Sequence, residues 1–200
     1  MIHRLSLNVA HSMHQVVLET PRLRLRAFEA TDAADVVRLA GDKEIAATTR
    51  MIPHPYELPM AVAWLESLPE AHRRGELENF AITLRTTGEL MGSIGLVINP
   101  VDRHAELGYW IGKPYWDNGY ATEAARVIVD HVFVDLKLHR LFAHHFSRNA
   151  ASGRVMQKLG MKCEGYMREH RYKFGSFEDL VIYGMTANDY RDHLARQVQE

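Results

Sequence analysis

The chain contains segments with a two-residue hydrophobic period and segments with a helical period. A strict alternation at 22–26, directly after Pro21, predicts a half-buried strand with its arginines on one face. Two further segments surround Gly88 and predict a hairpin that turns at this glycine. The predicted strands are 22–26, 80–85, 90–98, 104–111, 140–147, 161–172 and 178–186, the last two joined across Gly175 and Ser176.

Amphipathic helices are predicted between the strands. Thr31 with Asp32 supplies a helix start, and the helix that follows is expected to stop at Gly41. A loop is expected from Thr48 to Pro59, and Pro69 is expected to kink or split the next helix. The other predicted helices are 60–74, 123–136, 150–159 and a polar one from about 188. Hairpins mixed with helical crossovers indicate an α/β fold with a mixed sheet.

A turn at Asp117, Asn118 and Gly119 separates the predicted strand 104–111 from the helix that follows. A strand that passes through a glycine turn into a helix directs several backbone N–H groups at one point, with the positive end of the helix dipole behind them. The segment therefore predicts an anion site for a phosphate-bearing group. The alternative is a plain helix N-terminus with a glycine turn.

Length and composition fit one domain at 17–200, preceded by a loose leader at 1–16. A formal net charge of −1 argues against nucleic acid as a partner, and no apolar run approaches the roughly 20 residues that span a bilayer. The single cysteine, Cys163, fits a reducing cytoplasm. His144 and His145 are adjacent on a predicted strand and point to opposite faces, so no metal is expected.

Four segments occur in an order and at separations that resemble a known family. They are ETPRLRLR at 19–26; ELGYWI at 106–111 followed by WDNGYATEA at 116–124; NAASGRVMQKLGM at 149–161; and EGYMR at 164–168 with DLVIY at 179–183. Together they resemble the GNAT superfamily of acetyl-CoA-dependent N-acetyltransferases, and specifically its RimJ/RimL-like branch. The resemblance implies a mixed, mostly antiparallel central sheet flanked by helices.

The resemblance also implies an enzyme that moves an acetyl group from acetyl-CoA to a primary amine. The acceptor in this branch is commonly a protein N-terminus, while relatives modify polyamines, amino acids and other small amines. A homodimer is compatible with the resemblance. Trp116 and Asp117 depart from the family's pyrophosphate turn, which has Gln or Arg and often an extra glycine there. They are the one hint of an alternative, a CoA-binding regulatory module without turnover.

Glu106 is the first candidate for catalysis. It lies on the strand that leads into the phosphate turn, so a cofactor anchored at Gly119 would pass it on the way back along the strand. A carboxylate there would act as a base or hold the substrate amine. The alternative is a surface carboxylate that pairs with Arg103 or with a neighbouring strand.

The resemblance implies further site residues. Ser152 would donate a proton or a hydrogen bond to the leaving sulfur, and Asn149 would contact the cofactor arm; for both, a helix cap is the alternative. In the family the strand at 104–111 splays from the strand at 140–147, and the arm lies in the gap. The expected cofactor-binding residues, chiefly through backbone N–H groups, are Trp110, Ile111, Asn118, Gly119, Tyr120, Ala121, Thr122 and Asn149.

Overall fold

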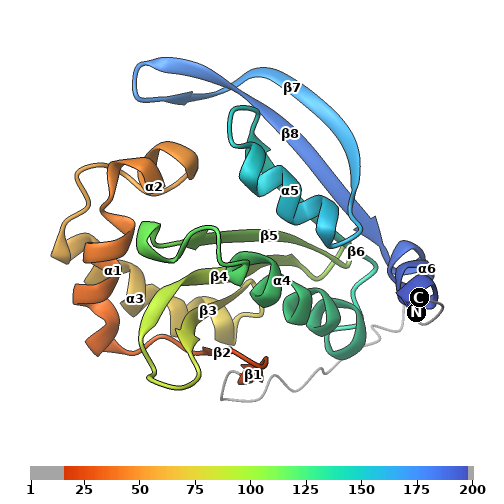
Figure 1. Ribbon diagram of the computed structural model, residues 1–200, viewed down its shortest axis with the longest axis horizontal. Helices are drawn as coiled ribbons and strands as arrows, with labels where there is room; N and C mark the ends of the chain where they lie inside the picture. The colour runs from red at the N-terminus through yellow and green to blue at the C-terminus, as the bar shows by residue number, and fades with distance from the viewer. Residues whose placement is uncertain (1–15, 198–200) are drawn as a thin grey trace, which may run out of the picture.

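The computed structural model describes residues 16–197, which form an eight-stranded sheet with helices on both faces (Figure 1). Apart from Val16, the leader predicted at 1–16 lies outside the described residues. The strands are β1 (Leu18–Glu19), β2 (Leu23–Arg26), β3 (Leu77–Leu84), β4 (Leu90–Asn99), β5 (His104–Ile111), β6 (Arg140–Phe146), β7 (Lys162–Lys173) and β8 (Ser176–Thr186). Their order in the sheet is β1-β2-β3-β4-β5-β6-β8-β7.

Neighbouring strands run antiparallel except for β5 and β6, which are parallel. The predicted α/β fold with a mixed, mostly antiparallel sheet is therefore confirmed. The helices are α1 (Ala33–Ala40), α2 (Lys43–Thr48), α3 (Leu58–Arg73), α4 (Tyr120–Asp130), α5 (Ala150–Lys158) and α6 (Ala187–Gln197). Short turns of helix precede α1 at 30–32, precede α4 at 113–115 and extend α4 at 131–135.

Three helices differ from the sequence prediction. α2 was not predicted; Asp42 caps it by accepting a hydrogen bond from the Glu44 N–H at 2.7 Å. α3 is not split at Pro69 but continues to Arg73, although Pro69 has no N–H to donate to the Leu65 carbonyl. α4 begins at Tyr120 rather than at Glu123, because Gly119 takes a positive φ of 77° and starts the helix directly behind it.

The two faces of the sheet carry separate hydrophobic clusters. On one face, α4 and α5 cover the largest cluster, whose fully buried members include Leu23, Phe80, Ile94, Leu96, Ile128, Leu141 and Met156. On the other face, α1 and α3 pack through Val36, Leu39, Ala61 and Leu65. Each buried Leu or Ile contributes about 1.5–3 kcal/mol relative to an exposed one. Within residues 16–197, no helix combines the length and apolar composition needed to cross a membrane.

The β7–β8 hairpin extends beyond the rest of the sheet and arches toward α2 (Figure 1). Near its tip, Lys173 Nζ donates a hydrogen bond to the backbone oxygen of Ile52 at 2.6 Å. The hairpin is thus attached to the segment between α2 and α3, and these two elements enclose one end of the space above the sheet.

A buried histidine links the end of α4 to the sheet. His131 Nε2 lies 2.8 Å from Glu78 Oε2 on β3, and its Nδ1 lies 2.8 Å from Asp135 Oδ2. The side chains of His131 and Glu78 are almost fully buried, whereas Asp135 is exposed. Burial acts to lower the pKa of His131, but the hydrogen bonds to the two carboxylates outweigh burial and raise it. The imidazolium form therefore stabilises the fold.

This arrangement predicts how stability depends on pH. Because the pKa of His131 is raised in the folded protein, the contribution is fully present below the unfolded value of about 6.5 and is lost as pH rises through the folded value. His131→Leu leaves a buried carboxylate at Glu78 unpaired and should lower the free energy of unfolding at pH 6 by about 3–5 kcal/mol. Urea denaturation between pH 5 and 9 measures both effects.

Asp135→Asn is the matched control. It removes the exposed partner of the same imidazole and should cost no more than about 1 kcal/mol. Equal losses for the two variants, or a stability that His131→Leu does not change at pH 6, would show that the His131–Glu78 pair does not stabilise the fold.

Candidate active site

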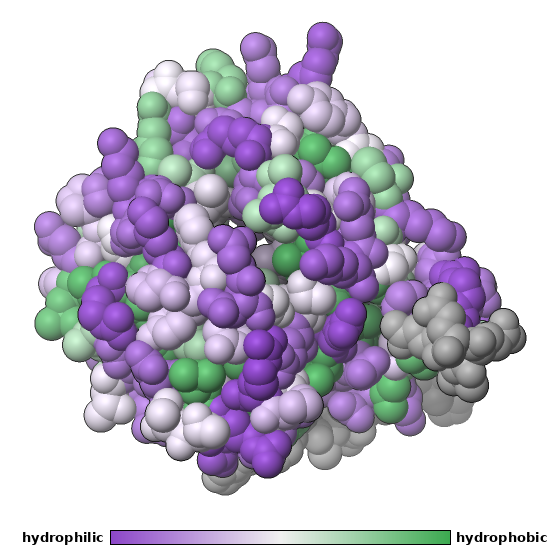
Figure 2. Space-filling view, viewed as in Figure 1, coloured by the Kyte–Doolittle hydropathy of each residue, from purple (hydrophilic) through white to green (hydrophobic). Residues whose placement is uncertain are grey.

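The site begins where β5 and β6 separate. The two strands pair only over His104–Arg140, Ala105–Leu141 and Glu106–Phe142, whereas β5 continues to Ile111 and β6 to Phe146. Beyond Glu106 the strands line a cleft of about 1150 Å³. In Figure 2 a hollow lies near the centre of the face shown, with both hydrophilic and hydrophobic residues around it. The splay that the resemblance implied is therefore present.

Successive backbone N–H groups of β5 point alternately toward β4 and toward β6. The Gly112 N–H bonds to Met91 O at 2.8 Å, and the register of β5 against β4 pairs Trp110 with Ser93 and Gly108 with Gly95. Hydrogen-bonded pairs recur every second residue in an antiparallel ladder, so the Trp110 N–H points toward β4. The N–H groups of Tyr109 and Ile111 face the gap instead.

The loop before α4 has an unusual backbone. Both Asp117 (φ 60°) and Gly119 (φ 77°) are in the left-handed region, which glycine adopts readily and other residues rarely. Asp117 thus takes, at some cost, the conformation of the glycine that the family often has there. Its side chain is exposed, so water screens the charge.

Side chains within the loop bond to its own backbone. Trp116 Nε1 donates to Ile111 O at 2.6 Å, so the residue that replaces the family's Gln or Arg connects the loop to β5. Asn118 Nδ2 donates to Trp116 O at 2.8 Å and to Tyr115 O at 3.3 Å. These bonds hold the turn in shape. They leave the backbone N–H groups at the start of α4 without partners inside the helix, as at every helix N-terminus.

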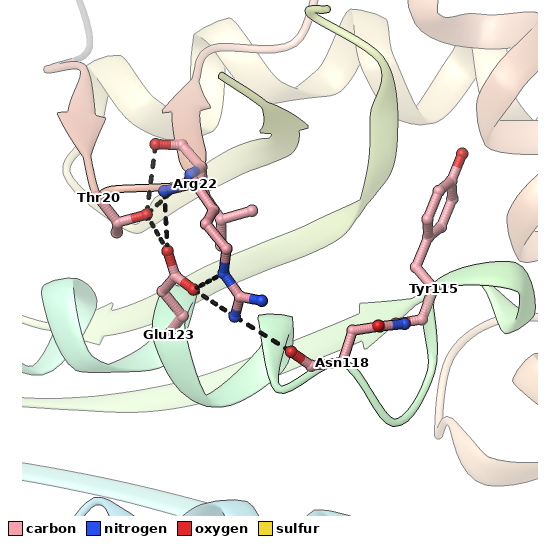
Figure 3. Close-up of polar contacts among 6 residues, drawn as sticks. Thr20, Arg22, Tyr115, Asn118 and Glu123 are labelled. Atoms are coloured by element: carbon pink, nitrogen blue, oxygen red, sulfur yellow. Dashed lines mark hydrogen bonds and ion pairs between the residues drawn. The ribbon is translucent and has the colours of Figure 1, made fainter. Parts of the chain in front are cut away.

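A second network attaches this loop to the first strands (Figure 3). Glu123, in the first turn of α4, accepts hydrogen bonds from the Thr20 hydroxyl at 2.5 Å and from Arg22 Nε at 2.6 Å. Arg22 also donates from Nη2 to Asn118 O at 3.1 Å and lies over the Tyr120 ring, 4.5 Å from its centroid. One guanidinium therefore contacts both the turn and the first helical turn.

The charge on Glu123 is favoured by this network. Burial acts to raise the pKa of Glu123, but the hydrogen bonds from Thr20 and Arg22 outweigh burial and lower it. Glu123 therefore remains a carboxylate at neutral pH and keeps Arg22 in place.

On the α5 side of the gap, Ser152 contacts Tyr109, a residue of β5. Tyr109 Oη and Ser152 Oγ share a hydrogen bond of 2.7 Å. Burial raises the pKa of Tyr109 to about 12, against a smaller opposite effect of the bond to Ser152, so the phenol keeps its proton. Asn149 Oδ1 accepts from the Ser152 N–H at 3.2 Å and caps α5. Thus the helix-cap alternative holds for the Asn149 side chain.

On the opposite face of the gap, Glu106 lies between two cationic or basic groups. Its Oε1 is 3.5 Å from Arg50 Nη2 and 3.3 Å from His144 Nδ1. Arg103, the partner suggested by the sequence, donates instead to Lys137 O at 2.9 Å. Glu106 is therefore a cleft residue that pairs with the neighbouring strand β6, as the second part of the alternative had it, and with Arg50.

The His144 imidazole is neutral near pH 7. Burial is the largest influence and lowers its pKa; Glu106 acts to raise it, and nearby cations, first Arg50, lower it further. A neutral imidazole beside a carboxylate can accept a proton. From the sequence, His144 was weighed only as a metal ligand. Its place beside Glu106, two residues after the Phe142 that pairs with Glu106, depends on a strand register that the sequence does not specify.

His145 points away from His144, as predicted from the strand period. Its Nδ1 is 2.8 Å from Phe146 O, and its ring packs on Tyr183 with centroids 5.8 Å apart. Across the described part of the chain, no three His, Cys, Asp or Glu side chains are grouped so that they could hold a metal ion.

Comparison with known proteins identifies this arrangement. A family model described as acetyltransferase (GNAT) domain matches residues 22–162. The chain belongs to the GNAT acetyltransferase family. The uncharacterized N-acetyltransferase YoaA of Bacillus subtilis (strain 168) is 30% identical to this GNAT protein over 173 residues, which cover 85% of this chain and 96% of YoaA.

Solved structures share the fold of this GNAT protein. The GNAT-family acetyltransferase from Bacillus anthracis has a TM-score of 0.78 at 25% identity, with 86% of this chain and 99% of that chain covered. A RimL ribosomal L7/L12 alpha-N-protein acetyltransferase in complex with coenzyme A has a TM-score of 0.79 at 18% identity, covering 86% and 98%. The chain is thus an N-acetyltransferase, which transfers an acetyl group to an amine, as the resemblance implied.

The network around Glu123 predicts a selective effect on the cosubstrate. In Glu123→Gln the Arg22 guanidinium loses its carboxylate, and the loop amides are no longer held in one arrangement. The KM for acetyl-CoA should rise about tenfold, the effect of about 1.4 kcal/mol, while kcat and the KM for the acceptor change less than about threefold. Steady-state kinetics with each substrate varied separately measures the difference.

Glu19→Gln is the matched control, because it removes the same charge from an exposed pair with Arg24 at 3.8 Å. If Glu123→Gln lowers thermal stability but leaves the KM for acetyl-CoA at the control value, the network supports only the fold.

Proposed function

We propose that the cleft binds acetyl-CoA along β5 and acetylates a primary amine that enters from the Glu106 face. The splay of β5 from β6 is the observation that carries this proposal. It exposes backbone N–H groups of Tyr109 and Ile111 to the gap, and the turn at Gly119 lies where β5 leads into α4. A long ligand with a phosphate at one end fits this combination.

The groups suited to hold acetyl-CoA are backbone N–H groups and the helix-capping residue Asn149. The N–H groups of Gly119, Tyr120, Ala121 and Thr122 would bind the diphosphate at the positive end of α4, with Asn118 shaping the turn. The Ile111 N–H and the residues around Asn149 would hold the arm. Relative to the sequence prediction, Trp110 contributes its side chain to the cleft wall, and Tyr109 supplies the second backbone donor.

The two faces of the gap would divide the proton chemistry. When bound, acetyl-CoA supplies the acetyl group as a thioester, whose sulfur needs a proton as it leaves. Ser152, hydrogen-bonded to Tyr109, would donate that proton and would regain one from water as CoA leaves. On the other face His144 would accept the proton that the amine loses, and Glu106 would orient the imidazole and attract the amine. Glu106 thus acts through His144, in place of the direct base role first suggested for it.

Two classes of acceptor are compatible with this proposal. RimL is a ribosomal L7/L12 alpha-N-protein acetyltransferase, so a protein N-terminus is one candidate acceptor and a small amine is the other. We also propose a cytoplasmic enzyme, which suits the exposed free thiol of Cys163. Homodimerisation stays a prediction of the resemblance.

An acetylation assay with a panel of primary amines tests the function. Thiol release from acetyl-CoA should accelerate with at least one peptide N-terminus or small amine. Gly119→Glu is the negative control, because it places a carboxylate at the anion loop and should abolish CoA binding in calorimetry. Tight CoA binding without turnover for any amine would instead support the regulatory module.

The role of His144 predicts a change in the pH profile. At saturating acceptor, kcat should fall only at pH values below the ordinary titration range of histidine, because burial lowers the pKa of His144. His144→Gln should lose about 10²-fold in kcat at pH 7.5 and should lack this acidic limb. A variant that is slower but keeps the limb would assign the titration to another group and remove His144 from the base role.

A further inference from the structure

The end of the cleft that contains Glu106 and His144, which we call the acceptor mouth, is surrounded by cationic side chains. Arg50, which lines the cleft, lies 3.5 Å from Glu106 Oε1, and Arg171 pairs across the β7–β8 hairpin with Glu178, whose carboxylate binds the cleft-lining Arg148. Arg50 follows α2, whereas His170 and Arg171 lie on β7. Positive groups therefore approach the mouth from both of the elements that enclose it.

The carboxylates at the mouth already have basic partners. Glu106 lies between Arg50 and His144, and Glu178 Oε2 accepts from Arg148 Nε at 2.8 Å. Glu44, which also lines the cleft, is bound to Lys113. Further along the hairpin, Asp179 accepts hydrogen bonds from the Tyr166 hydroxyl and the Glu169 N–H. None of these carboxylates belongs to a purely acidic cluster of the kind that would attract a polycation.

Positive charge consequently exceeds negative charge at the mouth. Arg171 faces Glu178 across the β7–β8 hairpin, but the carboxylate of Glu178 is shared with Arg148. Lys173 adds a further cation, and the repulsion between Arg148 and Lys173 acts, after burial, to lower the Lys173 pKa. With the Lys113–Glu44 pair included, five cationic side chains (Arg50, Lys113, Arg148, Arg171 and Lys173) thus outnumber three carboxylates (Glu44, Glu106 and Glu178). Such a mouth attracts anions and repels polyamines.

We propose that the acceptor carries a carboxylate within a few bonds of its reactive amine, and that Arg171, assisted by Arg50, binds this carboxylate. The proposal rests on the proposed function. An arginine guanidinium forms charge-assisted and often bidentate bonds with a carboxylate, which fixes the orientation of the ligand. The bound carboxylate would place the neighbouring amine between Arg171 on β7 and His144 on β6. A polyamine would bring a second ammonium into the same positive field.

Matched acceptors test the charge preference. Peptides with Asp, Asn or Lys at the second position share an α-amine of similar pKa, and free amino acids are compared with their amides; spermidine completes the panel. The kcat/KM for the Asp peptide should exceed that for the Asn peptide about tenfold, with Lys peptides and spermidine lowest. The ratio should shrink at about 1 M salt, where the Debye length is about 3 Å. The Asp and Asn peptides form one pair, and each free amino acid with its amide forms the other. Comparing the two pairs shows whether the carboxylate belongs to a peptide or to a free amino acid.

Substitutions of Arg171 test whether the charge preference arises at the acceptor mouth. Arg171→Gln should reduce the Asp/Asn ratio several-fold, and Arg171→Glu should favour the Lys peptide. Arg24→Gln, an exposed change on β2 with the same loss of charge as Arg171→Gln, should leave the ratio unchanged. Binding of the N-acetylated peptides to the enzyme–CoA complex, measured by calorimetry, reports the same charge preference for acceptors that react slowly.

The outcomes separate the two proposals. Equal kcat/KM and equal binding for the Asp and Asn members, or a preference for spermidine, would overturn the anionic acceptor while leaving acetyl transfer intact. A ratio that Arg171→Glu leaves unchanged would also overturn it. Charge-selective binding with no acetylation of any amine would contradict the proposed function and support the anionic mouth.

Discussion

The short parallel pairing of β5 with β6 is the constraint on which the site depends. β5 is paired with β4 along its whole length, and β6 is paired with β8 along its whole length, so neither strand follows the other beyond Glu106. The gap is therefore bounded by two intact antiparallel ladders. Backbone N–H groups in the gap cost free energy if they are buried without a partner. An extended ligand with amide groups satisfies them in the way that a further strand would.

Because side chains alternate between the two faces of a strand, residues with different chemical roles lie on opposite sides of this gap. On β5, Tyr109 faces α5 and meets Ser152, whereas Glu106 faces the opposite side. On β6, His145 packs near α5, where a Cβ at Gly153 would lie 2.8 Å from its Nε2, and His144 turns toward Glu106. Groups that release a proton and groups that accept one are thus kept apart by the sheet itself.

Much of the fold followed from local pattern, because strand period, turn glycines and helix caps are short-range signals. The eight-residue strand β5 and the hairpin at Gly88 are examples. The six-residue α2 was missed because it carries too few turns for a periodic signal. In the site, Glu106, Ser152 and Gly119 were singled out from sequence, and the cleft brings the three together.

Their partners could not be found in the same way. The bond between Tyr109 and Ser152 spans 43 residues, and the bond between Arg22 and Glu123 spans 101. Such contacts depend on sheet order and register, which a single sequence does not specify. The departures at Trp116 and Asp117 are a further example, because their effect depends on contacts that the sequence does not show. A left-handed conformation costs a residue other than glycine about 1–2 kcal/mol.

The bonds that Trp116, Asn118 and Arg22 make to the loop offset that cost, so the turn keeps its shape without the family's extra glycine. A loop held in this way before the ligand arrives loses little conformational freedom on binding. The unusual residues therefore do not by themselves favour a module without turnover, because the anion loop keeps its geometry by other contacts.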